Sequence, residues 1–156
     1  MDSCFERASA KSQLAAGGRL PLSGTVFLSG RDSDKGHVQR LARKLVEMGF
    51  TILATSGTAS RLEEANIPVK RVNKVMQGRP NCVDAIRSGD VQMVINTSQG
   101  GQAARDSYDI RRGALTMGIP HYTTIAGARA ATYAIAVLKE GDLGVAPLQS
   151  YFKGEF

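Results

Sequence analysis

Short apolar runs and longer amphipathic stretches alternate along the chain. Five apolar or β-branched runs predict strands at residues 25–29, 51–54, 69–72, 91–96 and 121–125. Apolar spacing near 3.6 residues and helix-forming composition predict helices at residues 37–48, 60–65, 83–88, within 100–117, and at 128–139. Gly49 follows the first of these helices and is expected to end it.

The regular alternation of strand and helix predicts the fold class. It favours an α/β protein, a Rossmann-like three-layer sandwich with a five-stranded parallel sheet. Such sheets bind ligands outside the carboxyl ends of their strands. Polar segments follow the predicted strands at this edge: GRDSDK, TSGT, NKV and NTSQGG, with a Thr pair on the fifth strand. We therefore expect one shared ligand site there.

Length and composition narrow the class of protein. The chain has 156 residues, 42% apolar and 22% charged, which suits one globular domain. No apolar run approaches the roughly 20 residues that span a bilayer, and the N-terminus lacks an apolar signal region. We therefore expect a cytoplasmic protein that does not contact membranes. Cys4 and Cys82 lack metal-ligand spacing, so no metal is expected.

The net charge of +6 allows an anionic partner. The basic residues are spread along the sequence, and the chain has no Trp on which bases could stack. We therefore expect no nucleic-acid binding. A small anionic ligand or a solvated basic face explains the charge equally well.

A phosphate cradle is the first candidate for the site. Thr55, Ser56, Gly57 and Thr58 follow the second strand and supply hydroxyl groups and exposed backbone N–H groups. The helix that follows directs the positive end of its dipole at them. A Thr or Ser before a helix is also a common N-cap, which is the simpler explanation for this segment alone.

Two lysines strengthen the phosphate hypothesis. Lys35 follows the first strand and Lys74 follows the third. If the second strand lies between these two, both ammonium groups can flank residues 55–58. Two cations and several hydroxyl groups suit a dianionic phosphate.

Polar residues near the fourth strand are candidates for the rest of a ligand. Asn96, Thr97 and Ser98 offer amide and hydroxyl groups, and Asp106 and Ser107 can cap the long helix or contact a base edge. No nucleophile–histidine–acid set or metal-protease motif is present. His37, His121, Asp32 and Asp34 are the remaining acid–base candidates, and each is more simply explained by exposure or packing.

Three motifs in this order resemble one family: VNKV-x-x-GRP, VINT, and DSYDIRR followed by TTIAGARAA. The chain resembles the C-terminal allosteric, methylglyoxal-synthase-like domain of the carbamoyl-phosphate synthase large subunit. The resemblance implies three parts. Residues 1–20 are expected to be a remnant of the linker from a preceding ATP-grasp domain, residues 21–150 the allosteric domain, and residues 151–156 a C-terminal tail.

The family resemblance implies a regulatory role. The parent enzyme is a glutamine-hydrolysing, ATP-dependent ligase that makes carbamoyl phosphate for pyrimidine and arginine synthesis. Its cofactors are ATP with Mg or Mn and K, and none is expected in this domain. Expected partners are the effectors UMP and IMP, the ATP-grasp domains, the glutaminase small subunit and, at the domain boundary, ornithine. The fragment alone is expected to be non-catalytic.

The same resemblance assigns roles to residues of this chain. The effector phosphate is expected at Lys35, Lys74 and residues 55–58. The ribose and base are expected at Asn96, Thr97, Ser98, Asp106 and Ser107. Thr123 and Thr124 are expected to couple this site to the preceding domain.

Methylglyoxal synthase, a lyase of the same fold acting on dihydroxyacetone phosphate, is the alternative. Such an enzyme needs a carboxylate base and a histidine beside the substrate. In this chain the base position falls on Arg79 and the histidine position near Arg105. Asp32 matches a further acidic position. The resemblance therefore favours the regulatory domain.

Overall fold

The computed structural model describes residues 20–97 and 101–139, without the side chains of residues 102 and 103. Of the expected linker remnant at residues 1–20, only Leu20 is described, and it is buried. The expected tail at residues 151–156 lies outside the described residues, as does Ser98.

A five-stranded parallel sheet in the order β3-β2-β1-β4-β5 forms the centre of the fold. The strands are β1 (Thr25–Ser29), β2 (Thr51–Thr55), β3 (Lys70–Val72), β4 (Met93–Asn96) and β5 (His121–Tyr122). Strand β2 lies between β1 and β3, which is the arrangement that brings the segments after those three strands together.

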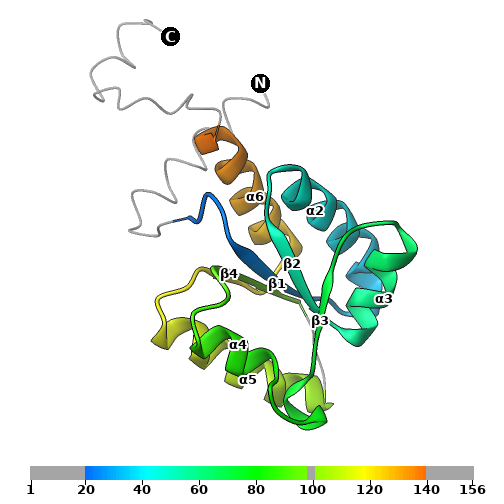
Figure 1. Ribbon diagram of the computed structural model, residues 1–156, viewed down its shortest axis with the longest axis vertical. Coiled ribbons are helices and arrows are strands. Elements are labelled where there is room, and N and C mark those ends of the chain that lie inside the picture. The colour runs from blue at the N-terminus through cyan, green and yellow to red at the C-terminus, as the bar shows by residue number, and fades with distance from the viewer. Residues whose placement is uncertain (1–19, 98–100, 140–156) are drawn as a thin grey trace, which may run out of the picture.

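Helices cover both faces of the sheet (Figure 1). One layer contains α2 (Lys35–Glu47), α3 (Ser56–Glu64) and α6 (Ile125–Lys139), and the other contains α4 (Cys82–Arg87) and α5 (Gly101–Thr116). Short 3₁₀ helices, η1 (Asp32–Asp34) and η2 (Val75–Gln77), lie in the loops after β1 and β3. The predicted three-layer α/β sandwich is confirmed.

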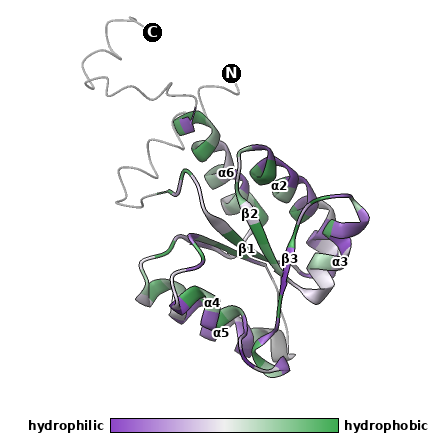
Figure 2. Ribbon diagram, in the orientation of Figure 1, coloured by the Kyte–Doolittle hydropathy of each residue, from purple (hydrophilic) through white to green (hydrophobic). Residues whose placement is uncertain are grey.

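The period of two along β1 divides the apolar residues between two core clusters. Val26 and Leu28 belong to the cluster beneath α2, α3 and α6, whereas Phe27 belongs to the cluster beneath α4 and α5. Hydrophobic and hydrophilic residues alternate along α4 and α5, because each helix buries one side (Figure 2). The central strands are therefore fixed from both faces.

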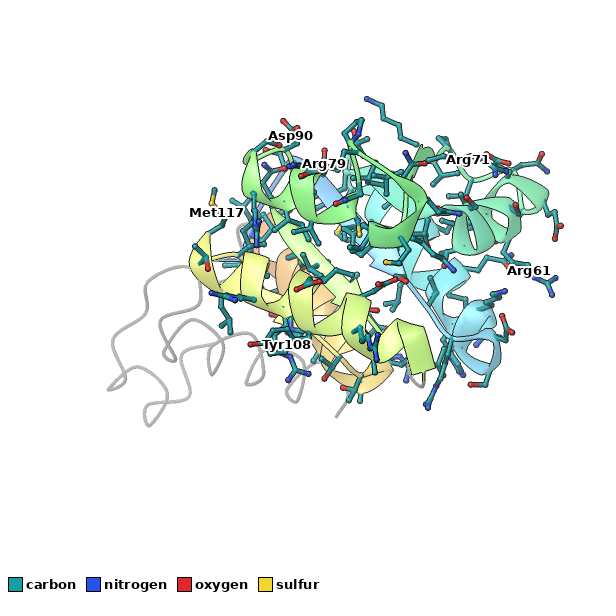
Figure 3. The ribbon with its side chains drawn as sticks, turned by 90° about the horizontal axis from the view of Figure 1, so that it is seen from below. Arg61, Arg71, Arg79, Asp90, Tyr108 and Met117 are labelled. Atoms are coloured by element: carbon teal, nitrogen blue, oxygen red, sulfur yellow. The ribbon has the colours of Figure 1, made fainter. Side chains whose placement is uncertain are left out.

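Polar and aromatic side chains lie on the outer surface of the helices, including Arg61 on α3 and Tyr108 on α5 (Figure 3). Tyr108 is 64% exposed. None of the helices in the described part of the chain combines the length and apolarity needed to cross a membrane.

Gly49 ends α2, as predicted. Its φ of +93° is favourable for glycine, and its N–H donates to the carbonyl of Val46 at 2.9 Å. The N–H of Phe50 donates to the carbonyl of Leu45 at 3.0 Å, which completes a Schellman motif. The chain therefore turns sharply from α2 into β2.

Two helices begin earlier than predicted, at the edge where the site is expected. α2 begins at Lys35 instead of residue 37, and α3 begins at Ser56 instead of residue 60. The predicted start of this helix at residue 60 is therefore wrong, because residues 56–58 already belong to the first turn of α3. Thr55 has an extended backbone, with φ −72° and ψ 159°, and the small residues after it enter the helix at once.

The predicted fifth strand at residues 121–125 is too long. It ends at Tyr122, and α6 begins at Ile125 instead of residue 128. The hydroxyl oxygen of Thr124 accepts a hydrogen bond from the N–H of Gly127 at 3.1 Å. This capping bond stabilises the first turn of α6 and so favours helix over strand there.

Candidate ligand-binding site

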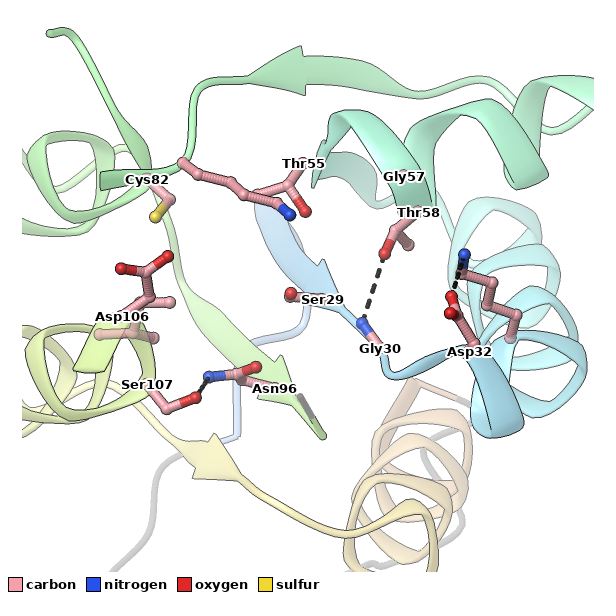
Figure 4. Close-up of a pocket in the computed structure, with 13 residues that line it drawn as sticks. Ser29, Gly30, Asp32, Thr55, Gly57, Thr58, Cys82, Asn96, Asp106 and Ser107 are labelled. Carbon is pink, nitrogen blue, oxygen red and sulfur yellow. Dashed lines mark hydrogen bonds and ion pairs between the residues drawn. The ribbon is translucent and has the colours of Figure 1, made fainter. Parts of the chain in front are cut away.

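A pocket of about 190 Å³ opens at the carboxyl ends of β1, β2 and β4 (Figure 4). It is lined by Ser29, Gly30, Asp32, Lys35, Thr55, Gly57, Thr58, Lys74, Cys82, Asn96, Asp106, Ser107 and Ile110. These residues come from strands, loops and helices between β1 and α5, and they meet at the sheet edge where the sequence predicts a site.

The N-terminus of α3 forms one end of the pocket. Thr55 ends β2, and Gly57 and Thr58 lie in the first turn of α3. Within the described residues, the Thr55 side chain makes no capping hydrogen bond, so the simple N-cap explanation is wrong here. The hydroxyl oxygen of Thr58 accepts the N–H of Gly30 at 3.3 Å. The first-turn amides and the helix dipole make this end suitable for an anion.

Lys35 and Lys74 both line the pocket, although 39 positions separate them in the sequence. Lys35 is the first residue of α2, and its side chain is only 22% exposed. Lys74 precedes η2 after strand β3. The order of the three strands places one lysine on each side of β2, so both can contact an anion at the N-terminus of α3.

Asp32 lies at the same end of the pocket and forms an ion pair with Lys35. This hydrogen bond and the charge of Lys35 lower the pKa of the Asp32 carboxyl group, with smaller contributions from Arg61 and Lys74. Asp32 is therefore ionised at neutral pH and cannot donate a proton there.

The opposite end of the pocket is formed by β4, α4 and α5 (Figure 4). Asn96 ends β4, and its side-chain amide donates to the hydroxyl oxygen of Ser107 at 3.0 Å. Asp106 and Ser107 lie in the second turn of α5, so the suggested role of capping this helix is wrong. Together these residues offer both donors and acceptors at this end.

Cys82 and Ile110 add apolar surface beside these polar groups. Burial is the main cause that raises the pKa of the Cys82 thiol to about 11, and the charge of Asp106 adds to it. The thiol is therefore uncharged at neutral pH and is a poor nucleophile. We regard Cys82 as part of the pocket wall.

Some predicted site residues do not line the pocket. Ser56 lies in the first turn of α3 but is not among the lining residues. Thr97 is buried and does not line the pocket. Its hydroxyl oxygen lies near Gly30, 3.6 Å from the position that a Cβ on this glycine would take. Thr123 and Thr124 are exposed between β5 and α6, outside the pocket. Ser98 remains a prediction.

Sequence reasoning did not select Ser29, Gly30, Cys82 or Ile110 for the site. Ser29 is the last residue of β1, so its position at the carboxyl edge could have identified it. Ile110 lies one helical turn after Asp106, and this spacing places both on one side of α5. Cys82 gave no such signal. No cluster of His, Cys, Asp or Glu that could hold a metal occurs in the described parts of the chain.

Comparison with known sequences identifies the family of this chain. A sequence profile described as the MGS-like domain matches residues 37–123. The chain belongs to the MGS-like domain family. The carbamoyl phosphate synthase large chain of Rhizobium meliloti (strain 1021) is 51% identical over 98% of this chain. The "Carbamoyl phosphate synthase large chain, C-terminal section" of Methanopyrus kandleri is 46% identical over 100% of this chain.

This MGS-like chain corresponds to a small part of those relatives. It spans 13% of the length of the R. meliloti protein and 29% of the M. kandleri section. Among solved structures, methylglyoxal synthase from Elizabethkingia anophelis NUHP1 has the same fold, with a TM-score of 0.59 and 21% identity. That alignment covers 72% of this chain and 79% of the synthase. It supports the fold and carries no information about activity.

Proposed function

We propose that this MGS-like domain binds a nucleoside monophosphate, UMP or IMP, as an allosteric effector of a carbamoyl phosphate synthase large chain. The names of the relatives support the parent enzyme, and the two-ended pocket supports the ligand. The parent uses ATP with Mg or Mn and K to make carbamoyl phosphate from bicarbonate and glutamine-derived ammonia, and this domain takes no part in the chemistry.

The observation that carries this proposal is the position of Lys35 and Lys74 beside the N-terminus of α3. A phosphate monoester has a charge between about −1.5 and −2 at pH 7. Two ammonium groups compensate that charge, while the first-turn amides of α3 and the hydroxyl groups of Thr55 and Thr58 donate to its oxygens. A neutral ligand would leave Lys74 without such a counter-charge, whereas Lys35 is already paired with Asp32.

The opposite end of the pocket suits a nucleoside. Asn96, Asp106 and Ser107 supply polar groups for ribose hydroxyls or a base edge, and Ser98 is predicted to join them. Cys82 and Ile110 supply apolar surface against which a base can pack. UMP and IMP share the phosphate and the ribose, so the base-facing residues decide between them.

Regulation requires the rest of the parent enzyme. Effector binding changes its activity only if the two conformational states of the enzyme bind the effector differently, typically by about 1–3 kcal/mol. Thr123 and Thr124 are exposed before α6 and are candidates for contact with the preceding domain, where ornithine could also bind. The ATP-grasp domains and the glutaminase small subunit are the other proposed partners.

The lyase alternative has less support. The position of its catalytic base corresponds to Arg79, which is 80% exposed and pairs with Asp84 at 2.5 Å. Neither Arg79 nor Arg105 lines the pocket. The pocket carboxylates are Asp32 and Asp106, of which Asp32 is held ionised by Lys35.

Calorimetric titration of the 156-residue chain with UMP, IMP, uridine and inorganic phosphate tests the proposal. We expect at least one nucleotide to bind more tightly than phosphate, and uridine not to bind at matched concentrations. Absence of heat and of a thermal shift with millimolar nucleotide would contradict it. A colorimetric assay with dihydroxyacetone phosphate tests the lyase alternative, because turnover to methylglyoxal would replace the regulatory proposal.

A further inference from the structure

A second concave surface is lined by residues of α2 and α6. These two helices pack against each other on one face of the sheet (Figure 1). This α2–α6 groove has a volume of about 160 Å³ and is lined by His37, Arg40, Leu41, Lys44, Ile125, Arg129, Thr132 and Tyr133. It shares no lining residue with the pocket described above. The two nevertheless meet at the first turn of α2, where Lys35 and His37 lie on different sides of the helix.

The spacing of the lining residues explains why they form a groove. Positions 37, 40, 41 and 44 fall on one side of α2, and positions 125, 129, 132 and 133 fall on one side of α6. Leu41 is buried, and the hydroxyl group of Thr132 donates to the carbonyl of Ala128 at 2.8 Å. The floor is therefore apolar or already hydrogen-bonded, and the charged groups form the rim.

The charged residues of this rim are all basic. Arg40, Lys44 and Arg129 are exposed cations, and none of them has an ion-pair partner among the residues that the structure describes. The sequence of α6 contains no Asp or Glu, and α2 contains only Glu47. Of the carboxylates in the described ranges, none lines the groove. The partner that complements this surface is therefore anionic.

This arrangement is unfavourable for the isolated domain. Arg40 and Lys44 are like charges four residues apart on one helix, which destabilises α2. The first turns of α2 and α6 also border the groove, and the positive ends of their dipoles add to the same potential. Conflicts between local sequence and electrostatics of this kind are typical of functional surfaces.

The dimensions of the rim favour a peptide over a small ion. His37 and Lys44 are seven residues apart on α2, or about 10 Å along the axis at 1.5 Å per residue. A single phosphate or carboxylate cannot contact both ends. A peptide segment with several carboxylates can contact Arg40, Lys44 and Arg129 together, while an aliphatic side chain packs on Leu41 and Ile125.

We propose that the α2–α6 groove docks an acidic peptide segment that carries an aliphatic anchor residue. The segment pairs its carboxylates with the cationic rim and buries its anchor on the groove floor. This surface shares no lining residue with the proposed nucleotide pocket, so groove variants leave the residues of that pocket unchanged.

Fluorescence polarisation with a labelled peptide of three Glu-Glu-Leu-Glu repeats tests this proposal on the 156-residue chain. We expect saturable binding that weakens as salt is raised, since exposed charges are screened. The double variant Arg40→Glu/Arg129→Glu should lose binding by at least about tenfold. The variant Arg40→Gln/Arg129→Gln removes the two charges without reversing them and should give an intermediate loss of peptide affinity. It replaces the first variant in the test if that variant does not fold.

The matched control is a charge reversal on the opposite face of the sheet. Arg112 on α5 is exposed and lies outside both concave surfaces, so Arg112→Glu should change peptide affinity by less than the reversal of either groove arginine alone. Equal losses in Arg112→Glu and Arg40→Glu would overturn the proposal, because they indicate attraction by net charge alone. Failure of the peptide to bind would also overturn it. The proposal would also be overturned if a labelled single-stranded DNA bound instead of the peptide and if this binding were lost in the same groove variants.

Discussion

Asp32 contacts the ammonium group of Lys35 inside the pocket to which Lys74 also contributes. The carboxylate is 93% exposed, whereas the Lys35 side chain is only 22% exposed. Asp32 therefore already pairs, from the solvent side, with the ammonium group that we expect to bind a phosphate. An incoming anion must compete with this carboxylate for Lys35.

This competition predicts the effect of Asp32→Asn. Removing the carboxylate frees Lys35 and removes a like charge from the ligand's surroundings, so affinity for UMP should rise by roughly two- to fivefold. Calorimetric titration at about pH 7.5 measures this change. Glu47→Gln, at the far end of α2 and outside the pocket, is the control with the same change of net charge. Weaker binding in Asp32→Asn would show that Asp32 contacts the ligand directly.

The buried thiol of Cys82 predicts a dependence of stability on pH. Burial and the nearby Asp106 raise its pKa from 9.0 to about 11. The unfolded chain releases this proton at lower pH than the folded protein does. The stabilising contribution is therefore complete below about pH 9 and is lost as the pH rises towards 11.

Urea unfolding of the wild type and of Cys82→Ala at about pH 7.5 and pH 10 tests this dependence. Loss of the buried side chain destabilises the variant at both pH values. The difference between the two proteins in free energy of unfolding should be smaller at the higher pH, because only the wild type loses the thiol contribution. A difference that stays constant would mean that the folded thiol titrates normally.

Two glycines, one within α2 and one that ends it, predict opposite stability changes on substitution by alanine. Gly49 adopts a φ of +93°, so Gly49→Ala should destabilise the protein by about 1 kcal/mol. Gly36 lies inside the helix, and a Cβ added to it would have no atom within 4 Å, so Gly36→Ala should stabilise the protein by about 0.4–1 kcal/mol. Urea unfolding at neutral pH compares both with the wild type. A neutral or stabilising effect of Gly49→Ala would contradict the assignment of the C-terminus of α2, and a destabilising effect of Gly36→Ala would contradict a helical backbone with open space at that position.

The sequence was sufficient to predict the layers of the fold because two spacings of apolar residues dominate it, a period of two in strands and one of about 3.6 in helices. In strand β1, Val26 and Leu28 point to one core cluster and Phe27 points to the other. Helix α2 buries Val38, Leu41 and Leu45. Helix starts were less predictable. Ser56 and Gly57 have low intrinsic helix propensity, and the fold places them in a helix because β2 leads directly into α3.

The candidate site was predicted in part, for a similar reason. Lys35 and Lys74 converge because of strand order, which follows from topology once β2 lies between β1 and β3. Ile110 was missed because an apolar residue on a helix is ordinarily part of the core. Thr97 was included because it follows Asn96 in the sequence, but it lies beyond the last residue of β4 and does not line the pocket.

The affinity of UMP for Lys74→Ala, compared with Lys70→Ala, tests the central claim most directly. Both lysines are exposed on the β3 side of the sheet, but only Lys74 lines the pocket. We predict that Lys74→Ala weakens UMP binding at least about tenfold, because a charged hydrogen bond to phosphate is lost. Lys70→Ala should stay within about twofold of the wild type. Unchanged UMP affinity in Lys74→Ala would contradict the claim that this pocket holds the phosphate.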